Sequence, residues 1–436
     1  MSNKNESSPK LIRAVSRWQV VGLSINDVIG SGVYLLPAAA AFLLGPMSIW
    51  AVLLAGLAVA VLILCFAEAS SYFDEPGGAY LYTREAFGDF IGFEVGWMTW
   101  LARVTSVASL SVGFALALGY LWPGATEGWG RAAVITGSLG ILTWINVIGV
   151  KEGAKMAVLL TIAKSLPLLL FIAIGLFFID GRLLAGDMPE ISFTSLSEAV
   201  LLLLFAYCGF ENTPGAAGEF KNPQRDIPFA LLTMVALVTL IYTLAQLVAV
   251  GTLPGLAQSD SPLAESAAQF AGPAIAVVMT IGAMVSIFGN VGNSTLVGPR
   301  YLYALAQDGF GHKALARVHP RYHTPAIAIV VQSAIALVLA LSGSFVELAM
   351  LSIIARLVTY VGTVAALPLL RKRFGHREKA FRLPGGNSIP FIALGLCGIF
   401  LVSATVANLV AGTLALLVGA VVYYFRSLKR NSKNVS

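Results

Sequence analysis

A glycine-rich interruption lies inside the first apolar stretch of the chain, directly after an acidic residue. Residues 28–33 read VIGSGV and follow Asp27. A helix that begins at such a break directs unpaired backbone N–H groups and the positive end of its dipole into the gap, which suits a carboxylate. A helix that ends there presents unpaired carbonyl oxygens, which suit an ammonium group. The break therefore predicts a site for a small molecule that carries both charges, as an α-amino acid does.

A second interruption lies in the apolar stretch 195–218. Residues 204–215 read LFAYCGFENTPG there. Irregular backbone in hydrocarbon is tolerated only where it lines a cavity or holds a ligand, because every backbone polar group must be satisfied within the protein. Glycine or proline interruptions at corresponding places of two halves indicate the central site of a transporter built from inverted repeats. The competing interpretation is that the glycines only let helices pack closely.

The composition of the chain requires a membrane around these breaks. Hydrophobic residues make up 57%, charged residues 11%, and the mean hydropathy is +0.82, values that one soluble domain of 436 residues could not hide in its core. A spanning helix needs about 20 apolar residues. We expect an all-α integral membrane protein in the lipid bilayer, with twelve transmembrane helices at residues 18–43, 48–73, 91–120, 131–149, 153–180, 195–218, 227–252, 273–299, 325–342, 345–370, 389–410 and 412–427.

Lysines and arginines gather in clusters between these stretches. If the N-terminus is cytoplasmic, all the clusters fall on that side, and only Arg131 and Arg182 lie outside, as the positive-inside rule favours. We therefore expect a multi-pass protein of the cell membrane with both termini in the cytoplasm. This loop bias accounts for the net charge of +6, so the charge does not indicate a nucleic acid partner. The clusters lie at residues 10–17, 151–155, 221–225, 313–321, 371–382 and 426–430.

Nothing in the sequence is arranged for catalysis or metal binding. Cys65, Cys208 and Cys397 lie far apart in apolar stretches and offer neither a disulfide framework nor a metal-binding pair. Serine and histidine show no arrangement for nucleophilic catalysis. We therefore expect no enzyme, no metal and no cofactor.

Several ordered motifs resemble those of the amino acid permeases of the amino acid–polyamine–organocation superfamily. They are IGSGVYLLP at 29–37, PGGAY at 76–80, GFE at 209–211 with EFKNP at 219–223, and RYLYA at 300–304 with QDG at 307–309. The resemblance covers the first ten expected spans, and it implies alternating access to an amino-acid-like solute.

The resemblance also implies a LeuT-like fold, with a five-plus-five inverted repeat in which helices 1 and 6 are broken. The expected division of the chain is a cytoplasmic tail at 1–17, a transport core at 18–371 with repeats at 18–180 and 195–371, a basic cytoplasmic loop at 372–388, two additional spans at 389–427, and a cytoplasmic tail at 428–436.

By resemblance, the substrate carboxylate lies on the N–H groups of Ser31 and Gly32, and its amine lies on the carbonyls of Val28, Phe205 and Cys208. Phe205 corresponds to an aromatic gate over the substrate, although core packing is the alternative. The complete expected binding set is Val28, Ile29, Gly30, Ser31, Gly32, Phe205, Ala206 and Cys208.

Lys164 falls where sodium-independent members of the family place a lysine, whose ammonium replaces a sodium ion between spans 1 and 8. Ser286 and Asn290 are its expected polar neighbours on span 8. The alternative is a lysine that extends to the cytoplasmic surface, but Lys164 lies about eleven residues into its span, or roughly 16 Å deep. The lysine would permit proton coupling or plain exchange without sodium.

The remaining intramembrane charges are functional hypotheses, because a charge is expensive there. By resemblance Glu211 senses acid, or it holds the second break together. Asp27 and Arg103 depart from the family pattern, and we expect them to pair, since an isolated buried charge costs several kcal/mol. Glu211 is the alternative partner of Arg103. Arg356 serves a gate or another carboxylate.

Three further acids, Glu68, Glu94 and Glu347, lie close enough to span ends to be structural.

The sequence therefore favours a secondary transporter for an amino acid or a closely related small amine. It is expected to be sodium-independent, with proton coupling or exchange. The alternatives are a polyamine or cationic amino acid exchanger, and a solute sensor or channel on the same fold.

Overall fold

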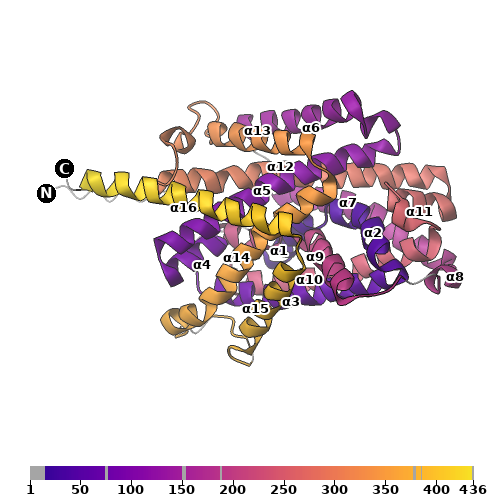
Figure 1. Cartoon of the computed structure of the whole chain (residues 1–436), viewed down its shortest axis with the longest axis horizontal. Coiled ribbons are helices and arrows are strands. Elements are labelled where there is room, and N and C mark those ends of the chain that lie inside the picture. The colour runs from indigo at the N-terminus through magenta and orange to yellow at the C-terminus, as the bar shows by residue number, and fades with distance from the viewer. Residues whose placement is uncertain are drawn as a thin grey trace.

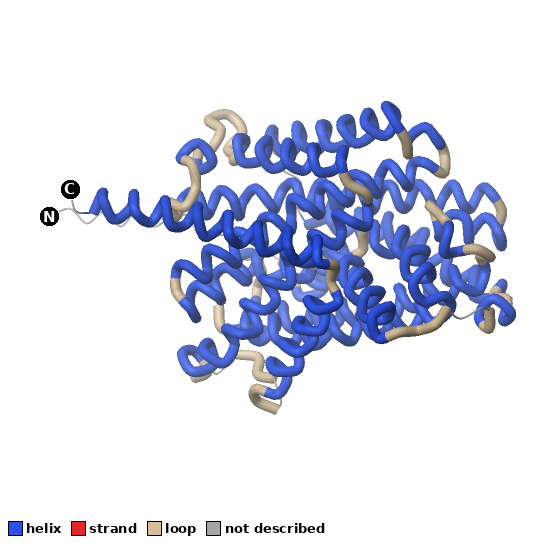
Figure 2. The backbone as a smooth tube through the Cα atoms, viewed as in Figure 1, coloured by secondary structure: helices blue, strands red, loops and turns tan. Residues whose placement is uncertain are grey.

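The computed structural model describes residues 15–73, 77–149, 154–186, 189–376, 380–383 and 385–434, and helices fill most of them (Figure 2). The first half contains α1 (Arg17–Val28), α2 (Ser31–Leu44), η1 (Gly45–Met47), α3 (Ser48–Ser71), α4 (Gly78–Phe87), α5 (Asp89–Gly119), η2 (Pro123–Ala125), α6 (Gly128–Ile148), α7 (Ala154–Gly175), η3 (Leu176–Phe178) and α8 (Gly181–Leu184). The second half contains α9 (Phe193–Tyr207), η4 (Phe210–Glu219), α10 (Pro223–Thr252), η5 (Leu256–Gln258), α11 (Pro262–Ala271), α12 (Pro273–Gln307), η6 (Lys313–Ala316), α13 (Ala326–Ser342), α14 (Phe345–Phe374), α15 (Ser388–Ser403) and α16 (Val406–Asn434).

Eight segments of the described chain are long and apolar enough to cross a bilayer, which makes this a multi-pass membrane protein. Three further apolar helices, α9, α13 and α15, are shorter. The expected all-helical membrane architecture is thus confirmed, whereas the number of crossings and the inverted repeat stay predictions. The eight segments are Ser31–Ser71, Asp89–Gly119, Gly128–Ile148, Thr161–Phe178, Pro223–Thr252, Pro273–Gln307, Phe345–Phe374 and Val406–Ser427.

Long helices enclose the middle of the molecule, where α1 and α9 lie (Figure 1). Helix α5 packs against both α12 and α14, and α3 packs against α10. Helices α6 and α13 pack together at the outer edge, and α16 projects beyond the body at one end (Figure 1). This arrangement surrounds the two expected breaks with helices that carry charged and polar side chains.

Both helix breaks predicted from the sequence are present. Helix α1 ends at Val28 and α2 begins at Ser31, so the chain leaves helical geometry for two residues. Helix α9 ends at Tyr207, and a 3-10 helix follows Gly209, whose φ is +126°. A Cβ at residue 209 would lie 2.4 Å from the carbonyl oxygen of Asp27. Glycine therefore allows the second break to touch the backbone of the first.

The three acids expected near span ends have different surroundings. Glu68 is buried and forms a bidentate ion pair with Arg371. Nε of Arg371 lies 2.6 Å from Oε1 of Glu68, and Nη2 lies 2.7 Å from Oε2. Glu347 caps the start of α14, where its Oε2 accepts from the N–H of Ser344 at 2.9 Å. Glu94 is buried as well, yet neither of its carboxylate oxygens has a hydrogen-bond partner in the described part of the chain.

Candidate functional site

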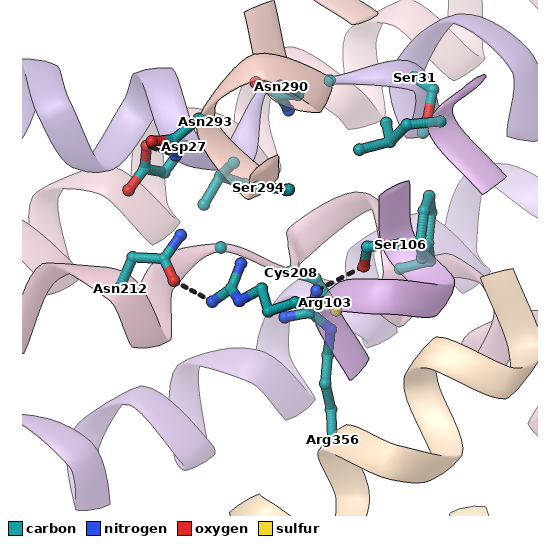
Figure 3. A pocket seen from close by; sticks show the side chains of 16 residues that line it. Asp27, Ser31, Arg103, Ser106, Cys208, Asn212, Asn290, Asn293, Ser294 and Arg356 are labelled. Carbon is teal, nitrogen blue, oxygen red and sulfur yellow. Dashed lines mark hydrogen bonds between the residues drawn. The ribbon is translucent and has the colours of Figure 1, made fainter. Parts of the chain in front are cut away.

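A cavity lies where the two breaks face α5, α12 and α14 (Figure 3). About 410 Å³ of space there, part of it open to solvent, is not filled by atoms. Of the residues expected from the sequence, its lining includes Asp27, Val28, Gly30, Ser31, Gly32, Arg103, Phe205, Cys208 and Asn290. Ile29, Ala206, Lys164, Glu211 and Ser286 lie behind this lining and contact it or the two breaks.

The start of α2 supplies donors to the cavity. The first amides of a helix have no partner within it, and Ser31 and Gly32 occupy these positions. The hydroxyl of Ser31 is buried and has no hydrogen-bond partner among the described residues. At Gly32 a Cβ would lie 2.5 Å from the Cα of Ala206, so only glycine lets α2 start this close to α9.

The helix ends supply acceptors, and one tyrosine joins them. The hydroxyl of Tyr242 lies 3.3 Å from the carbonyl oxygen of Val28 and 3.1 Å from that of Ala206. The carbonyl of Phe205 accepts the N–H of Cys208 at 3.2 Å. A carbonyl oxygen has two lone pairs, so Val28 and Phe205 can each accept a further donor. Tyr242 was not identified from the sequence, because nothing local shows which face of α10 meets α1.

Lys164 is 2% exposed and does not extend to the surface. Its Nζ donates to the carbonyls of Asn26 and Ile29, at 2.5 and 2.9 Å, and to Oδ1 of Asn290 at 3.1 Å. The hydroxyl of Ser286 also donates to the carbonyl of Ile29, at 3.3 Å. Lys164 thus joins the end of α1 to α12 through the neighbours expected from the sequence. Its role in coupling stays a prediction.

The expected direct contact between Asp27 and Arg103 is wrong. No ion pair joins them in the described structure. Nη2 of Arg103 lies 3.4 Å from Oε1 of Glu211, the alternative partner, and also donates to Oδ1 of Asn212. Asp27 instead accepts from Nδ2 of Asn293 at 2.7 Å. The reason is that Asn212 lies between the two charges, with its oxygen toward Arg103 and its nitrogen on the side of Asp27 (Figure 3).

Glu211 is the centre of a buried charge cluster. One oxygen, Oε1, meets the guanidinium groups of both Arg103 and Arg356. The other oxygen accepts the backbone N–H of Gly209 at 3.0 Å. Arg356 also donates to the hydroxyls of Ser106, at 2.7 Å, and Ser352, at 3.3 Å. These contacts let Glu211 hold the unwound segment, one of its two expected roles, while acid sensing stays a prediction.

Several uncharged residues of the cavity were missed in the sequence, namely Ser106, Leu110, Gly209, Asn212, Asn293 and Ser294. Serine and asparagine are too common to stand out singly. A signal existed in their spacing, because residues three apart share a helix face. Asn293 follows Asn290 by three positions, and Ser106 follows Arg103 by three.

Comparison with known proteins identifies the family. The family model described as amino acid permease matches residues 15–425. The chain belongs to the amino acid permease family. This permease is 30% identical to the serine/threonine exchanger SteT of Bacillus subtilis (strain 168) over 417 residues, which cover 92% of this chain and 94% of that protein.

Two further relatives come from the same bacterium. The branched-chain amino acid permease BcaP is 27% identical, with 97% of this chain and 95% of that protein covered. The methylthioribose transporter is also 27% identical, with 98% of this chain and 96% of that protein covered. The permease is thus similar over nearly its whole length to transporters of several small solutes.

Proposed function

We propose that this permease moves an amino acid across the membrane by alternating access. The observation that carries the proposal is the pairing of the two breaks in one cavity. The start of α2 supplies N–H donors for the α-carboxylate at Ser31 and Gly32. The carbonyls of Val28, Phe205 and Cys208 accept the α-ammonium group. The names of the relatives, which include an amino acid exchanger and an amino acid permease, support this assignment.

We also propose that transport needs no sodium. The ammonium of Lys164 already bonds two carbonyls near the end of α1 and Asn290 on α12, the two elements between which the family resemblance implies a sodium ion elsewhere. A second cation beside a buried ammonium would be repelled. The coupling is then to protons or to a counter-transported solute. The proposed topology is twelve membrane spans with both termini in the cytoplasm.

Counterflow in proteoliposomes tests the proposal. Vesicles containing the purified permease are loaded with one unlabelled amino acid at millimolar concentration and diluted into a trace of the same amino acid carrying a label. We expect the label to accumulate transiently, to the same level in sodium and in potassium buffer. If the label accumulates for none of the amino acids tested, the transport proposal is wrong. If it accumulates only in sodium buffer, the role given to Lys164 is wrong.

A pair of serine variants supplies the control. Ser31→Leu places a large side chain at the start of α2 and should abolish counterflow. Ser342→Leu makes the same change at an exposed position at the end of α13 and should not. Equal counterflow by both variants would contradict the binding site at the first break.

A further inference from the structure

One wall of the cavity carries a buried guanidinium with unused donors. Arg103 is 3% exposed, and its Nη2 makes both of its contacts, to Glu211 and Asn212. Its Nε is buried without a hydrogen-bond partner, and its Nη1 has no hydrogen bond to any residue that the structure describes. Figure 3 shows the second terminal nitrogen of Arg103 directed into the space between Asn212 and Ser294. An arginine that lines a cavity with spare donors is suited to an oxyanion.

The charges around the cavity do not balance. Two carboxylates, Asp27 and Glu211, lie among three basic groups, Arg103, Lys164 and Arg356, and the count that follows is for protonated Lys164. One positive charge is therefore in excess. A buried charge without a partner is costly, so a ligand with one net negative charge would complete the site.

The positions of the helix breaks and of Arg103 in the cavity indicate which part of the ligand carries that negative charge. The α-ammonium and α-carboxylate groups cancel each other at the two breaks, so the excess negative charge must lie on the side chain. Arg103 and Arg356 lie across the cavity from Ser31, where the α-carboxylate is placed (Figure 3). Asp27 on the far side accepts from Asn293, at 2.7 Å, and makes no direct contact with Arg103, whose Nε stays without a hydrogen-bond partner among the described residues.

We propose that the preferred substrate is an amino acid whose side chain ends in a carboxylate, which accepts from Nη1 of Arg103. The inference rests on the proposed function, because it assumes that the breaks hold the α-amino and α-carboxyl groups. It disfavours lysine, arginine and polyamines, since their cationic ends would add to the excess positive charge. A hydroxyl or amide side chain could bond the same nitrogen but would leave the charge unbalanced.

Competition against the wild-type permease decides the preference without any mutation. Counterflow of a labelled amino acid is measured in the presence of L-glutamate, L-aspartate, L-glutamine, L-asparagine, L-serine or L-lysine. We expect L-glutamate or L-aspartate to inhibit counterflow by half at a concentration at least tenfold lower than that of its own amide. If an amide, serine or lysine competes better than both acids, the charge inference is wrong while amino acid transport stands. If none competes, both proposals fail.

Two arginine variants test the assigned group. Arg103→Gln keeps a polar side chain beside Glu211, which still has Arg356, and should reduce the ratio of acid to amide affinity at least tenfold. Arg84→Gln removes an equal charge outside the cavity, where Arg84 pairs with Asp89 at 2.8 Å, and should leave the ratio unchanged. A wild-type ratio in a folded Arg103→Gln protein would overturn the role of Arg103. If that variant does not fold, the wild-type competition still decides the substrate class.

Discussion

The contact between Gly32 and α9 permits a sharp prediction for Gly32→Ala. The new Cβ would lie 2.5 Å from Cα and 2.6 Å from Cβ of Ala206. Carbon atoms in contact prefer roughly 3.5 to 4.0 Å, so α2 and α9 must separate by about 1 Å. Overpacking of this kind costs about 1–3 kcal/mol. If the cost falls on the substrate-bound arrangement, affinity drops by roughly 5- to 150-fold.

Two assays, thermal stabilisation by added amino acid and counterflow, measure the loss of stability and the loss of affinity. The Gly32→Ala protein should melt a few degrees lower than wild type and should need correspondingly more amino acid for the same stabilisation. Gly140→Ala is the matched control, because it adds the same methyl group in α6 at an exposed site where nothing lies within 4 Å. In a helix this change should be neutral or slightly stabilising.

The reasoning is refuted if Gly32→Ala and Gly140→Ala behave alike in both assays. It would also fail if Gly32→Ala melted lower but bound the ligand with unchanged affinity, since the methyl group would then disturb packing without disturbing the site.

Two other side chains give equally direct tests. Tyr242→Phe removes the hydroxyl shared by the ends of α1 and α9 and should lower stability by about 1–3 kcal/mol, with weaker ligand stabilisation; a wild-type melting temperature would show that the hydroxyl is not needed there. Glu94→Met replaces a buried carboxylate whose oxygens have no partner among the described residues and should raise the melting temperature by a few degrees, because an unsatisfied buried group is costly. A fall in melting temperature would contradict the unpaired state of Glu94.

The breaks were predictable because their causes are local. Glycine at 30, 32 and 209 interrupts an apolar run where the backbone must leave helical geometry, and this can be read without knowing any neighbour. The contacts of Lys164 were predictable in part for a similar reason. Its depth in the span follows from helix rise, and a buried ammonium needs oxygen partners. That these partners lie on α1 and α12 was implied by the family resemblance and not by spacing.

The partners of the other charges depended on geometry that spacing does not contain. Glu211 and Asn212 are adjacent in the chain, and only the tight 3-10 conformation after Gly209 lets both accept from Arg103. Because Asn212 lies between them, Asp27 does not contact Arg103 directly. An argument from charge alone therefore selected the wrong acid for the first pairing and could place Arg356 no more closely than beside some carboxylate.

The excess positive charge inferred for the cavity has an electrical consequence for the transport cycle. Moving one elementary charge through 100 mV changes the free energy by about 2.3 kcal/mol, or roughly fifty-fold in population. A membrane potential that is negative inside would draw the empty site toward the cytoplasm. The site with an acidic amino acid bound would be electrically neutral, and its change of access between the two sides of the membrane would not depend on voltage. The potential would then act on the return of the unloaded protein and not on the passage of its cargo.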